Sequence, residues 1–521
     1  MSSATSTQGR HGDVDVAVVG AGAAGLYAAL CAANEGATVA LLSAMPLAQT
    51  ASYWAQGGLA AVLATDDSFE LHLSDTERAG RGVVRGSAAE VLVSEAPERV
   101  HDLERLGFHF DADRHGRLAL GLEGGHSVRR IVHAGGSATG RRLLRELSAL
   151  VVGHPRVLVI EGARVSRLLC EDGRCTGVVC HASEDPEDRR AYGRIVTARA
   201  TVLSTGGAAA LWARTTNPPG SIGQGLLLAH AAGATLADLE FVQFHPTAVI
   251  GVEGREGFLI TEAIRGEGAT LLDSHGQRFV DELAPRDEVS RAIQSCLRES
   301  GERSVSLDMR AIDPARFPNV VGALREAGLD PMRELVPVAP AAHYTIGGIV
   351  TDLHARSAVA GLYAVGETAC TGLHGANRLA SNSLSECFVF GRRAALAALE
   401  EPALGDTAAE ASQVAVEADA STPRTDTSTD WRSERSSHDQ QDIKLALWRY
   451  AGIERSAEGL TELLDNPHPL ARLIAHSALM RKESRGTHTR SDYPECDKRL
   501  DGKHAVVRSG GELELDWQDW R

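Results

Sequence analysis

Asp15-Val-Ala-Val-Val19, Gly20-Ala-Gly-Ala-Ala-Gly25 and Thr38-Val-Ala-Leu-Leu42 are the stretches of this sequence that decide its fold. The first and third are apolar runs of strand length, and Leu26 to Glu35 is expected to form a helix between them. Glycines between a strand and a helix let a pyrophosphate sit on the helix N-terminus. This order predicts a Rossmann-like βαβ unit that binds an adenine dinucleotide through Gly20, Gly22, Ala23, Ala24 and Gly25.

The position after the second strand of such a unit usually carries an acid that holds a ribose hydroxyl. This sequence has Ser43 there. Because a serine hydroxyl can also hydrogen-bond a ribose, Ser43 belongs to the predicted cofactor site.

Three further stretches of small residues are expected to surround the cofactor. Ser52 to Gly58 suits the ribityl chain and ring of a flavin, and Ala200 to Gly207 is a strand that runs into a Gly-Gly turn. Gly366 to Leu384 lies between a predicted strand and helix, whose free N–H groups would face the flavin ring and stabilise its negative charge when reduced. Taken alone, this last stretch fits an ordinary glycine-rich turn equally well. The predicted contacts are Ser52, Ala55, Gln56, Gly57, Gly58, Gly206, Glu367, Asn382, Ser383 and Leu384.

Composition excludes some classes of function. The 521-residue chain has a formal net charge of −16 and no Lys/Arg run, which argues against a nucleic-acid binder. An anionic substrate must then be attracted by local Arg and His side chains. The apolar run from Val14 to Ala33 contains glycines at the end of a strand, so we expect neither a signal peptide nor a membrane span there.

The eight cysteines contain no C-x-x-C pair, and we expect them to be reduced in a cytoplasmic protein. Cys170, Cys175 and Cys180 come closest to a pattern, but they lie across a predicted hairpin whose turn is Glu171-Asp-Gly173.

We therefore expect an α/β protein with a Rossmann-like FAD-binding domain, an inserted α+β capping domain and a C-terminal helical domain. The FAD-binding domain would comprise residues 13–237 and 346–400, because the residue pattern between these segments differs from the pattern on either side. Residues 238–345 would form the capping domain, 401–440 a linker rich in Asp, Glu, Ser and Thr, and 441–521 the helical domain.

Three motifs in order carry a resemblance to a known family. They are Phe244-His-Pro-Thr247, Thr261-Glu-Ala-Ile-Arg-Gly-Glu-Gly268 and His374-Gly-Ala-Asn-Arg-Leu379. Together they resemble the flavoprotein family of succinate dehydrogenase, fumarate reductase and L-aspartate oxidase, from about residue 13 to 400 and again at Arg481-Lys-Glu-Ser-Arg-Gly486. The resemblance implies FAD as cofactor and a small dicarboxylate as substrate.

Within the family, two features favour the members that oxidise L-aspartate to iminoaspartate, the first step of NAD biosynthesis. Succinate dehydrogenases attach FAD to a histidine five residues before Gln-Gly-Gly, and Ala51 stands at that place here, so FAD is expected to be noncovalent. Leu122-Glu-Gly-Gly-His-Ser127 resembles the loop whose glutamate meets the substrate ammonium. The alternative is a fumarate reductase or succinate dehydrogenase flavoprotein that passes electrons to an iron–sulfur partner.

The resemblance also implies the catalytic residues. The dicarboxylate site maps onto His245, Thr261, His343 and Arg378, and Glu123 would orient the amine. Arg291 matches the arginine that moves a proton in the reductases, but its high pKa makes it an electrostatic stabiliser first. Hydride would pass from the substrate Cα to flavin N5, and O2 or fumarate would reoxidise the flavin.

Each residue also has an ordinary structural explanation. His245 alone fits a core histidine, Thr261 a helix cap, His343 a domain seam and Arg291 a surface ion pair with Asp287. The combined motifs favour the functional assignment, and they argue against a non-catalytic protein that has kept FAD for regulation.

Two positions depart from the family pattern and affect the expected strength of FAD binding. Gln224 and Ser137 stand where the family usually has an acid. The expected partners are L-aspartate, fumarate and O2, with quinolinate synthase as a candidate downstream partner. Sequence leaves open the physiological electron acceptor and the oligomeric state.

The first prediction concerns the attachment of FAD. Because Ala51 cannot form a histidyl bond, acid or heat denaturation should release all the FAD into the supernatant. The measurement is flavin fluorescence in the supernatant and on a denaturing gel. Flavin that stays with the polypeptide band would contradict the prediction.

Overall fold

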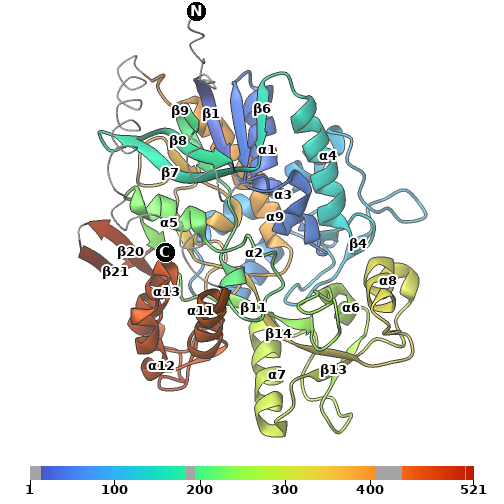
Figure 1. Cartoon of the computed structure of the whole chain (residues 1–521). Helices are drawn as coiled ribbons and strands as arrows, with labels where there is room; N and C mark the ends of the chain where they lie inside the picture. The colour runs from blue at the N-terminus through green and yellow to red at the C-terminus, as the bar shows by residue number, and fades with distance from the viewer. Residues whose placement is uncertain (1–12, 183–193, 405–436, 511) are drawn as a thin grey trace, which may run out of the picture.

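The computed structural model describes residues 13–182, 194–404, 437–510 and 512–521 (Figure 1). Residues 405–436 of the predicted linker lie outside the described part of the chain.

The predicted βαβ unit lies at the centre of the molecule. β1 (Val14–Val19) pairs in parallel with β2 (Val39–Ser43), and α1 (Ala23–Asn34) connects them. The helix begins three residues earlier than predicted, because Gly22 in extended conformation is already its N-cap. Gly20 has φ +109, and a Cβ there would lie 2.3 Å from the carbonyl oxygen of Ser204. Only glycine permits β1 to turn into α1 so close to β9.

A seven-stranded sheet extends from this unit in the order β6-β2-β1-β9-β8-β7, with β16 beside β9. β6, β2, β1, β9 and β16 are parallel to one another, whereas β8 is antiparallel both to β9 and to β7, with which it forms the predicted hairpin. The added strands are β6 (Val157–Glu161), β7 (Ala163–Glu171), β8 (Arg174–Ala182), β9 (Arg194–Leu203) and β16 (Leu362–Ala364).

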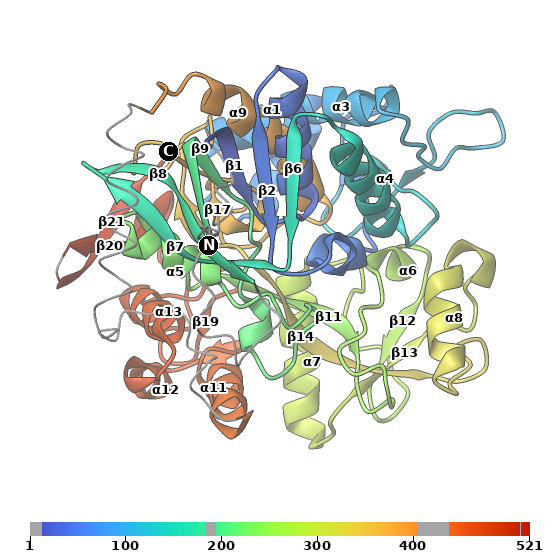
Figure 2. The ribbon, with the colours of Figure 1, turned by 45° about the horizontal axis from the view of Figure 1, so that its top comes forward.

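Helices cover one face of this sheet (Figures 1 and 2). α1 packs against both α4 and α9, and α3 packs against α9 and α2. Their shared core is rich in alanine, which allows these helices to approach closely. The helices are α2 (Phe69–Ala79), α3 (Gly86–Arg105), α4 (Thr139–Gly153) and α9 (Asn382–Leu399); the small sheet β3-β5-β4 beside them consists of Leu59–Ala60, Ile131–Val132 and Leu120–Gly121.

A separate antiparallel sheet, in the order β11-β14-β13-β12, lies below with its own hydrophobic core (Figure 1). All of its strands fall within residues 242–345, and on this ground we propose that the predicted capping domain of 238–345 is one unit. Its elements are β11 (Val242–Val249), α6 (Glu262–Gly266), β12 (Thr270–Leu272), α7 (Arg286–Ser300), β13 (Val305–Asp308), α8 (Pro318–Glu326) and β14 (Val336–Thr345).

The C-terminal region contains the expected helices and two long strands in addition. β20 and β21 form a hairpin that joins β10, β15 and β17 in a five-stranded sheet, so the chain end is tied to the FAD-binding part. Figures 1 and 2 show the helices of this region beside the capping sheet. The C-terminal elements are α11 (Ser437–Tyr450), β18 (Glu454–Arg455), α12 (Ala457–Glu462), α13 (Pro469–Met480), β19 (Thr489–Arg490), β20 (Lys503–Gly510) and β21 (Glu512–Asp519). Earlier in the chain are α5 (Gln224–Ala231) and the sheet strands β10 (Leu236–Ala237), β15 (Gly348–Val350) and β17 (Ala369–Cys370).

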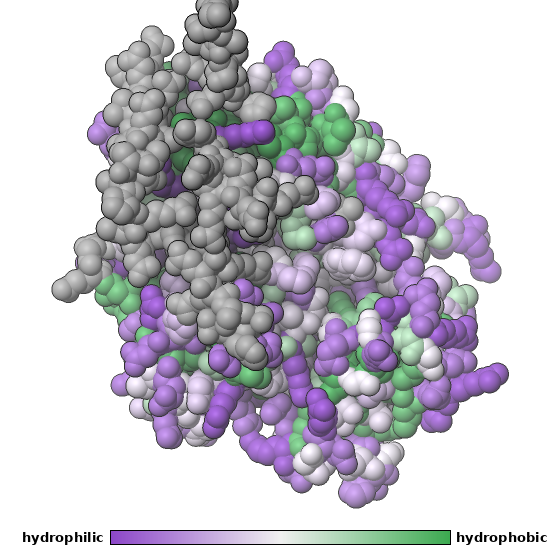
Figure 3. Space-filling view, viewed as in Figure 1, coloured by the Kyte–Doolittle hydropathy of each residue, from purple (hydrophilic) through white to green (hydrophobic). Residues whose placement is uncertain are grey.

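The surface seen in Figure 3 is largely hydrophilic, with smaller hydrophobic areas between the charged side chains. In the described ranges, no helix combines the length and the apolar character needed to cross a bilayer. All eight cysteines are free, as predicted.

The packing of α1 gives a prediction about stability. A Cβ on Gly25 would lie 2.0 Å from the Gly20 carbonyl oxygen, whereas nothing lies within 4 Å of a Cβ on Gly322 in α8. Gly25→Ala should lower the free energy of unfolding by about 1–3 kcal/mol through overpacking. Gly322→Ala should raise it by about 0.5–1 kcal/mol through helix propensity. Urea denaturation of both variants tests this, and equal effects would mean that α1 does not pack as described.

Candidate active site

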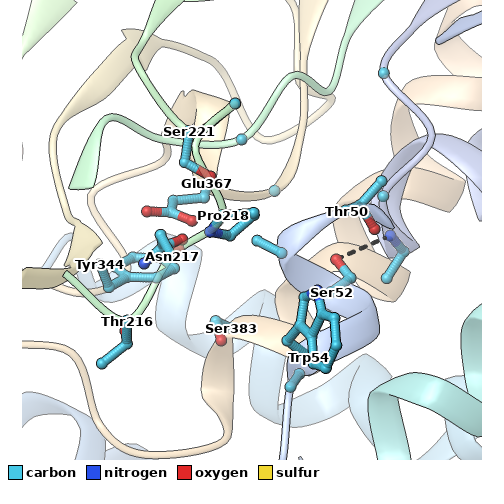
Figure 4. A pocket seen from close by; sticks show the side chains of 18 of the residues that line it. Thr50, Ser52, Trp54, Thr216, Asn217, Pro218, Ser221, Tyr344, Glu367 and Ser383 are labelled. Atoms are coloured by element: carbon cyan, nitrogen blue, oxygen red, sulfur yellow. Dashed lines mark hydrogen bonds between the residues drawn. The ribbon is translucent and has the colours of Figure 1, made fainter. Parts of the chain in front are cut away.

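A cavity of 660 Å³ lies where the FAD-binding part meets the capping sheet. One of its walls is made by Thr50, Ser52 and Trp54, and Thr216, Asn217, Pro218, Ser221, Tyr344 and Glu367 stand opposite (Figure 4). Ser383, at the start of α9, lies between the two walls (Figure 4). The cavity is large enough for a ligand of cofactor size.

Most of the predicted cofactor residues line this cavity. They are Gly20, Gly22, Ala23, Ala24, Ser43, Ser52, Ala55, Gln56, Gly57, Gly58, Gly206, Glu367, Ser383 and Leu384. Gly25 and Asn382 are not in the lining. Gly25 packs against Gly20 and Ser204, and the Asn382 amide bonds His72 and Thr76 on α2 instead.

The residues present fit FAD. Gly22, Ala23 and Ala24 present the N-terminus of α1 to one end of the cavity, where a pyrophosphate would be stabilised. Ser52 Oγ accepts a hydrogen bond from the Ala23 N–H at 3.2 Å and anchors the 52–58 loop there. At the other end, the cap residue Ser381 gives α9 no side-chain cap, so first-turn N–H groups remain for a ligand.

Glu367 is a buried carboxyl at the cavity wall. Burial raises its pKa to about 7, although the Thr345 N–H and hydroxyl donate to it at 2.9 and 3.0 Å. It is therefore a group that can hold or release a proton near neutral pH beside the cofactor site.

Arg378 is the cation at the capping end of the cavity. Its guanidinium is buried and lies 4.5 Å above the ring of Tyr344. It donates to Ser383 Oγ at 2.6 Å and to Gln243 Oε1 at 3.0 Å, and among the described residues it forms no ion pair with a carboxylate. Burial and the nearby charge of Arg286 lower its pKa to about 10. An anion bound in the cavity would neutralise the charge of Arg378.

Gln243 connects this cation to a second one. Its Oε1 accepts from Arg378 and from Arg286 NH1, both at 3.0 Å, while its Nε2 donates to the Arg378 carbonyl oxygen at 2.8 Å. One neutral amide oxygen thus holds two guanidinium groups at one site, and it does not neutralise the charge of either.

Two histidines lie beside these cations. The rings of His245 and His343 are 5.1 Å apart and edge to face. Burial, and then the charge of Arg286, hold the pKa of each well below its usual value, so both rings are neutral near pH 7. The Thr247 N–H donates to His245 Nδ1 at 3.3 Å, which places the proton of the neutral ring on Nε2. His343 Nδ1 contacts the Thr216 hydroxyl at 2.7 Å.

Glu123 is an ionised carboxylate in the same cavity. Burial alone would raise its pKa, but hydrogen bonds from His133 and Ser381, together with the charge of Arg286, outweigh burial and lower it to about 2. Ser381 Oγ donates to Oε2 at 2.7 Å. Glu123 therefore provides a fixed negative charge in the same cavity as Arg378 and Arg286.

Thr261 also lines the cavity and caps α6. Its N–H donates to Gln56 Oε1 at 3.2 Å, and Gln56 Nε2 donates to the Leu259 carbonyl oxygen at 2.6 Å. Gln56 thus joins the capping segment to the loop expected beside the flavin.

The structure separates Arg291 from the other predicted catalytic residues. Arg291 is absent from the cavity lining; it donates to the Gly486 carbonyl oxygen at 2.7 Å and pairs with Asp287. Arg286 in the first turn of the same helix lines the cavity, and its Nε lies 2.6 Å from Glu262 Oε2. The cavity lining therefore favours Arg286 over Arg291 as the arginine of the site.

Sequence reasoning also missed Gln243, Glu262 and Tyr344, which touch the two arginines. Gln243 adjoins a quoted motif, Glu262 belongs to one and Tyr344 follows His343, so proximity in sequence was the available signal. Of the two departures from the family pattern, Gln224 lines the cavity and donates to the Val165 carbonyl oxygen at 3.1 Å. Ser137 is buried outside the lining.

Comparison with known proteins places this site in context. Residues 15–384 match the family described as FAD binding domain, and residues 464–521 match fumarate reductase flavoprotein C-term. L-aspartate oxidase of Agrobacterium fabrum is 42% identical over 502 residues, covering 92% of this chain and 91% of the relative. L-aspartate oxidase of Caulobacter vibrioides is 41% identical over 530 residues, covering 95% and 98%.

Solved structures agree with these matches. E. coli quinol fumarate reductase has a TM-score of 0.87 at 30% identity, covering 98% of this chain and 97% of its own. Mycobacterium smegmatis Sdh1 has a TM-score of 0.82 at 30% identity, covering 98% and 95%.

The two arginines of α7 give a matched prediction. Arg286→Leu should weaken binding of a dicarboxylate such as succinate by about 2–5 kcal/mol, the cost of removing one member of a buried charge pair. Arg291→Leu should change binding by less than about 0.5 kcal/mol, because Arg291 is half-exposed and outside the cavity. Titration of the flavin absorbance with succinate measures both. A larger loss of succinate binding in the Arg291 variant would instead place Arg291 in the substrate site.

Proposed function

The chain belongs to the L-aspartate oxidase family of FAD-dependent oxidoreductases, which is related to succinate dehydrogenase and fumarate reductase, and from this premise we propose how its cavity oxidises L-aspartate to iminoaspartate. FAD is the cofactor, and when bound it supplies the hydride acceptor. The observation that carries the proposal is the coexistence of Glu123, an ionised carboxylate, with cations and neutral histidine donors in one cavity. Aspartate carries the complementary charges.

Arg378 binds a substrate carboxylate in this proposal. Its guanidinium has planar N–H donors suited to a carboxylate, and its two neutral partners, Gln243 and Ser383, hold it without neutralising it. The Tyr344 ring fixes it from below through a cation–π contact.

The histidines and Thr261 bind the second carboxylate. The neutral tautomer of His245 presents its Nε2–H as a donor, and His343 lies beside it. Neutral donors bind a carboxylate through hydrogen bonds and add no further positive charge near the two arginines. Together these residues would hold the Cα–H of the substrate in a single orientation.

Glu123 binds the ammonium group and so selects aspartate among dicarboxylates. The Ser381 hydroxyl and the His133 ring hold Glu123, and a substrate ammonium group would add a full positive charge beside this buried carboxylate. Succinate and fumarate lack this group, which makes Glu123 the residue that distinguishes the substrates.

Arg286 takes the role first assigned to Arg291. Its pairing with Glu262 keeps the guanidinium oriented toward the cavity, where it stabilises negative charge on the substrate. Proton transfer is a second role for it, and it requires the base form of a guanidinium, which is scarce near pH 7.

Reoxidation uses O2 or fumarate in this proposal. Reaction with O2 yields hydrogen peroxide, and reduction of fumarate yields succinate, which needs only the dicarboxylate site. Direct contact with quinolinate synthase, the cytoplasmic location and the place in NAD biosynthesis follow from the family resemblance and stay predictions for this chain.

A succinate dehydrogenase-type flavoprotein remains the alternative, since solved relatives include such proteins. Ala51, which lines the cavity, and Glu123 both count against it. Oxygen consumption with L-aspartate and without any other acceptor tests the proposal directly, and activity with succinate alone would favour the alternative.

The decisive variant is Glu123→Gln, which keeps the shape and removes the charge. It should lower kcat/KM for aspartate oxidation by about 2 kcal/mol, or about 30-fold, the scale of one hydrogen bond to a charged group. Fumarate reduction should change much less, because fumarate has no ammonium group. Glu256→Gln is the matched control, since Glu256 lines the same cavity at its exposed mouth. If both activities fall equally in the Glu123 variant, Glu123 supports the fold and not the amine.

A further inference from the structure

The hairpin formed by β7 and β8 brings two cysteines together. Asp172 and Gly173 both have positive φ, +47 and +76, which gives a tight two-residue turn. The next pair, Glu171 and Arg174, closes the turn, and Cys170 then lies directly opposite Cys175. The register of the hairpin therefore determines which two thiols meet.

The backbone around Cys175 keeps the two residues in close approach. The Cys175 N–H donates to the Ala360 carbonyl oxygen at 2.8 Å and so does not bond across the hairpin to Cys170. Cross-strand pairs without mutual hydrogen bonds have Cα atoms about 4.5 Å apart. Disulfides form at Cα separations of about 4.4–6.8 Å. The Cys175 thiol donates to the Gly177 carbonyl oxygen at 3.7 Å.

The two thiols differ in exposure and acidity. Cys170 is exposed, whereas Cys175 is fully buried. The neighbouring Cys170 side chain lowers the pKa of Cys175 against the effect of burial, with help from the Thr201 hydroxyl and the charge of Arg174. The Cys175 side chain, and then burial, raise the pKa of Cys170. The buried sulfur is therefore the more acidic of the two.

We propose that Cys170 and Cys175 are a modification site, a dithiol that hydrogen peroxide converts reversibly into a disulfide across the β7–β8 hairpin. The oxidant is available where the chain works, because O2-dependent turnover releases hydrogen peroxide; this source rests on the proposed function. The dithiol itself reacts with peroxide from any origin.

The chemistry balances in two steps. After its proton is lost, the Cys170 sulfur attacks H2O2 and becomes a sulfenic acid, and the released hydroxide takes up that proton as one water. The Cys175 thiolate attacks that sulfur and displaces hydroxide, which leaves as a second water with the remaining thiol proton. Two thiols and one peroxide become one disulfide and two waters. A dithiol reductant reverses the change by exchange.

Cys496 provides a matched comparison within the chain. It is also exposed, but its neighbours are Glu483 and Arg485, not a cysteine. Peroxide can oxidise it only to a sulfenic acid or beyond, unless it pairs with another molecule.

The test uses the full-length protein loaded with FAD. It is treated with an equimolar amount of H2O2, alkylated, and digested with trypsin without reduction. Trypsin cleaves after Arg174, so Cys170 and Cys175 fall on separate peptides that only a disulfide joins. The expected result is the joined pair, lost on treatment with dithiothreitol, with Cys496 outside any intramolecular bond. Alkylated Cys175 beside an over-oxidised Cys170 would overturn the proposal.

Two hairpin variants and one control variant test the pairing. In Cys175→Ser, the sulfenic acid of Cys170 should find no partner thiol and should proceed to irreversible oxidation. Cys496→Ser should form the disulfide as the parent chain does. Cys170→Ser changes an exposed side chain, and it should protect Cys175 from peroxide. A disulfide that persists in either hairpin variant would show different pairing and reject the site.

The source of the peroxide is tested separately. L-aspartate in air should replace added H2O2, and catalase should prevent the disulfide. If added peroxide joins the peptides and aspartate does not, the dithiol stands and the O2-dependent function fails. If added peroxide does not join them, the dithiol proposal fails whatever aspartate does.

Discussion

The rest of the site depends on the buried guanidinium of Arg378, which has no ion-pair partner in the described part of the chain. A buried charge is costly unless it is paired, and here its neighbours are an amide, a hydroxyl and an aromatic ring. These groups orient the guanidinium and leave its charge for a ligand. A carboxylate at the position of Gln243 would pair with Arg378 and compete with the substrate.

The same positive field explains the state of the other polar groups. Arg286 is among the causes that depress the pKa of His245, His343 and Glu123. Burial and this charge together keep the histidines neutral, while hydrogen bonds from His133 and Ser381 do most to keep Glu123 ionised. The site thus combines neutral donors with the cations Arg378 and Arg286 and the carboxylate of Glu123, and Glu262 pairs with Arg286. These states suit a substrate with two carboxylates and one ammonium group.

The cavity exists because distant parts of the chain meet. The βαβ unit contributes its helix N-terminus, the capping sheet contributes His245 and His343, and the start of α9 contributes Arg378 and Ser383. Gln56 ties two of these parts by bonding Leu259 and Thr261. A shift of the capping sheet would therefore disturb the carboxylate donors while leaving the dinucleotide end intact.

The sequence by itself determined the βαβ unit, FAD as the cofactor and the family. Glycine spacing and short motifs act through local backbone geometry, which can be inferred from the sequence alone. The predicted hairpin at Glu171 to Gly173 is another local feature, and the structure confirms it.

Only the tertiary structure decided which side chains enter the cavity. Arg286 and Arg291 belong to one helix, and five residues along a helix rotate a side chain by about 140°. One arginine consequently faces the cavity, and the other faces the Gly486 carbonyl oxygen. The bridge from Gln243 to two arginines and the outward turn of Asn382 toward α2 depend likewise on packing between segments far apart in sequence. No local pattern records such contacts, because they arise only when the separate segments pack together.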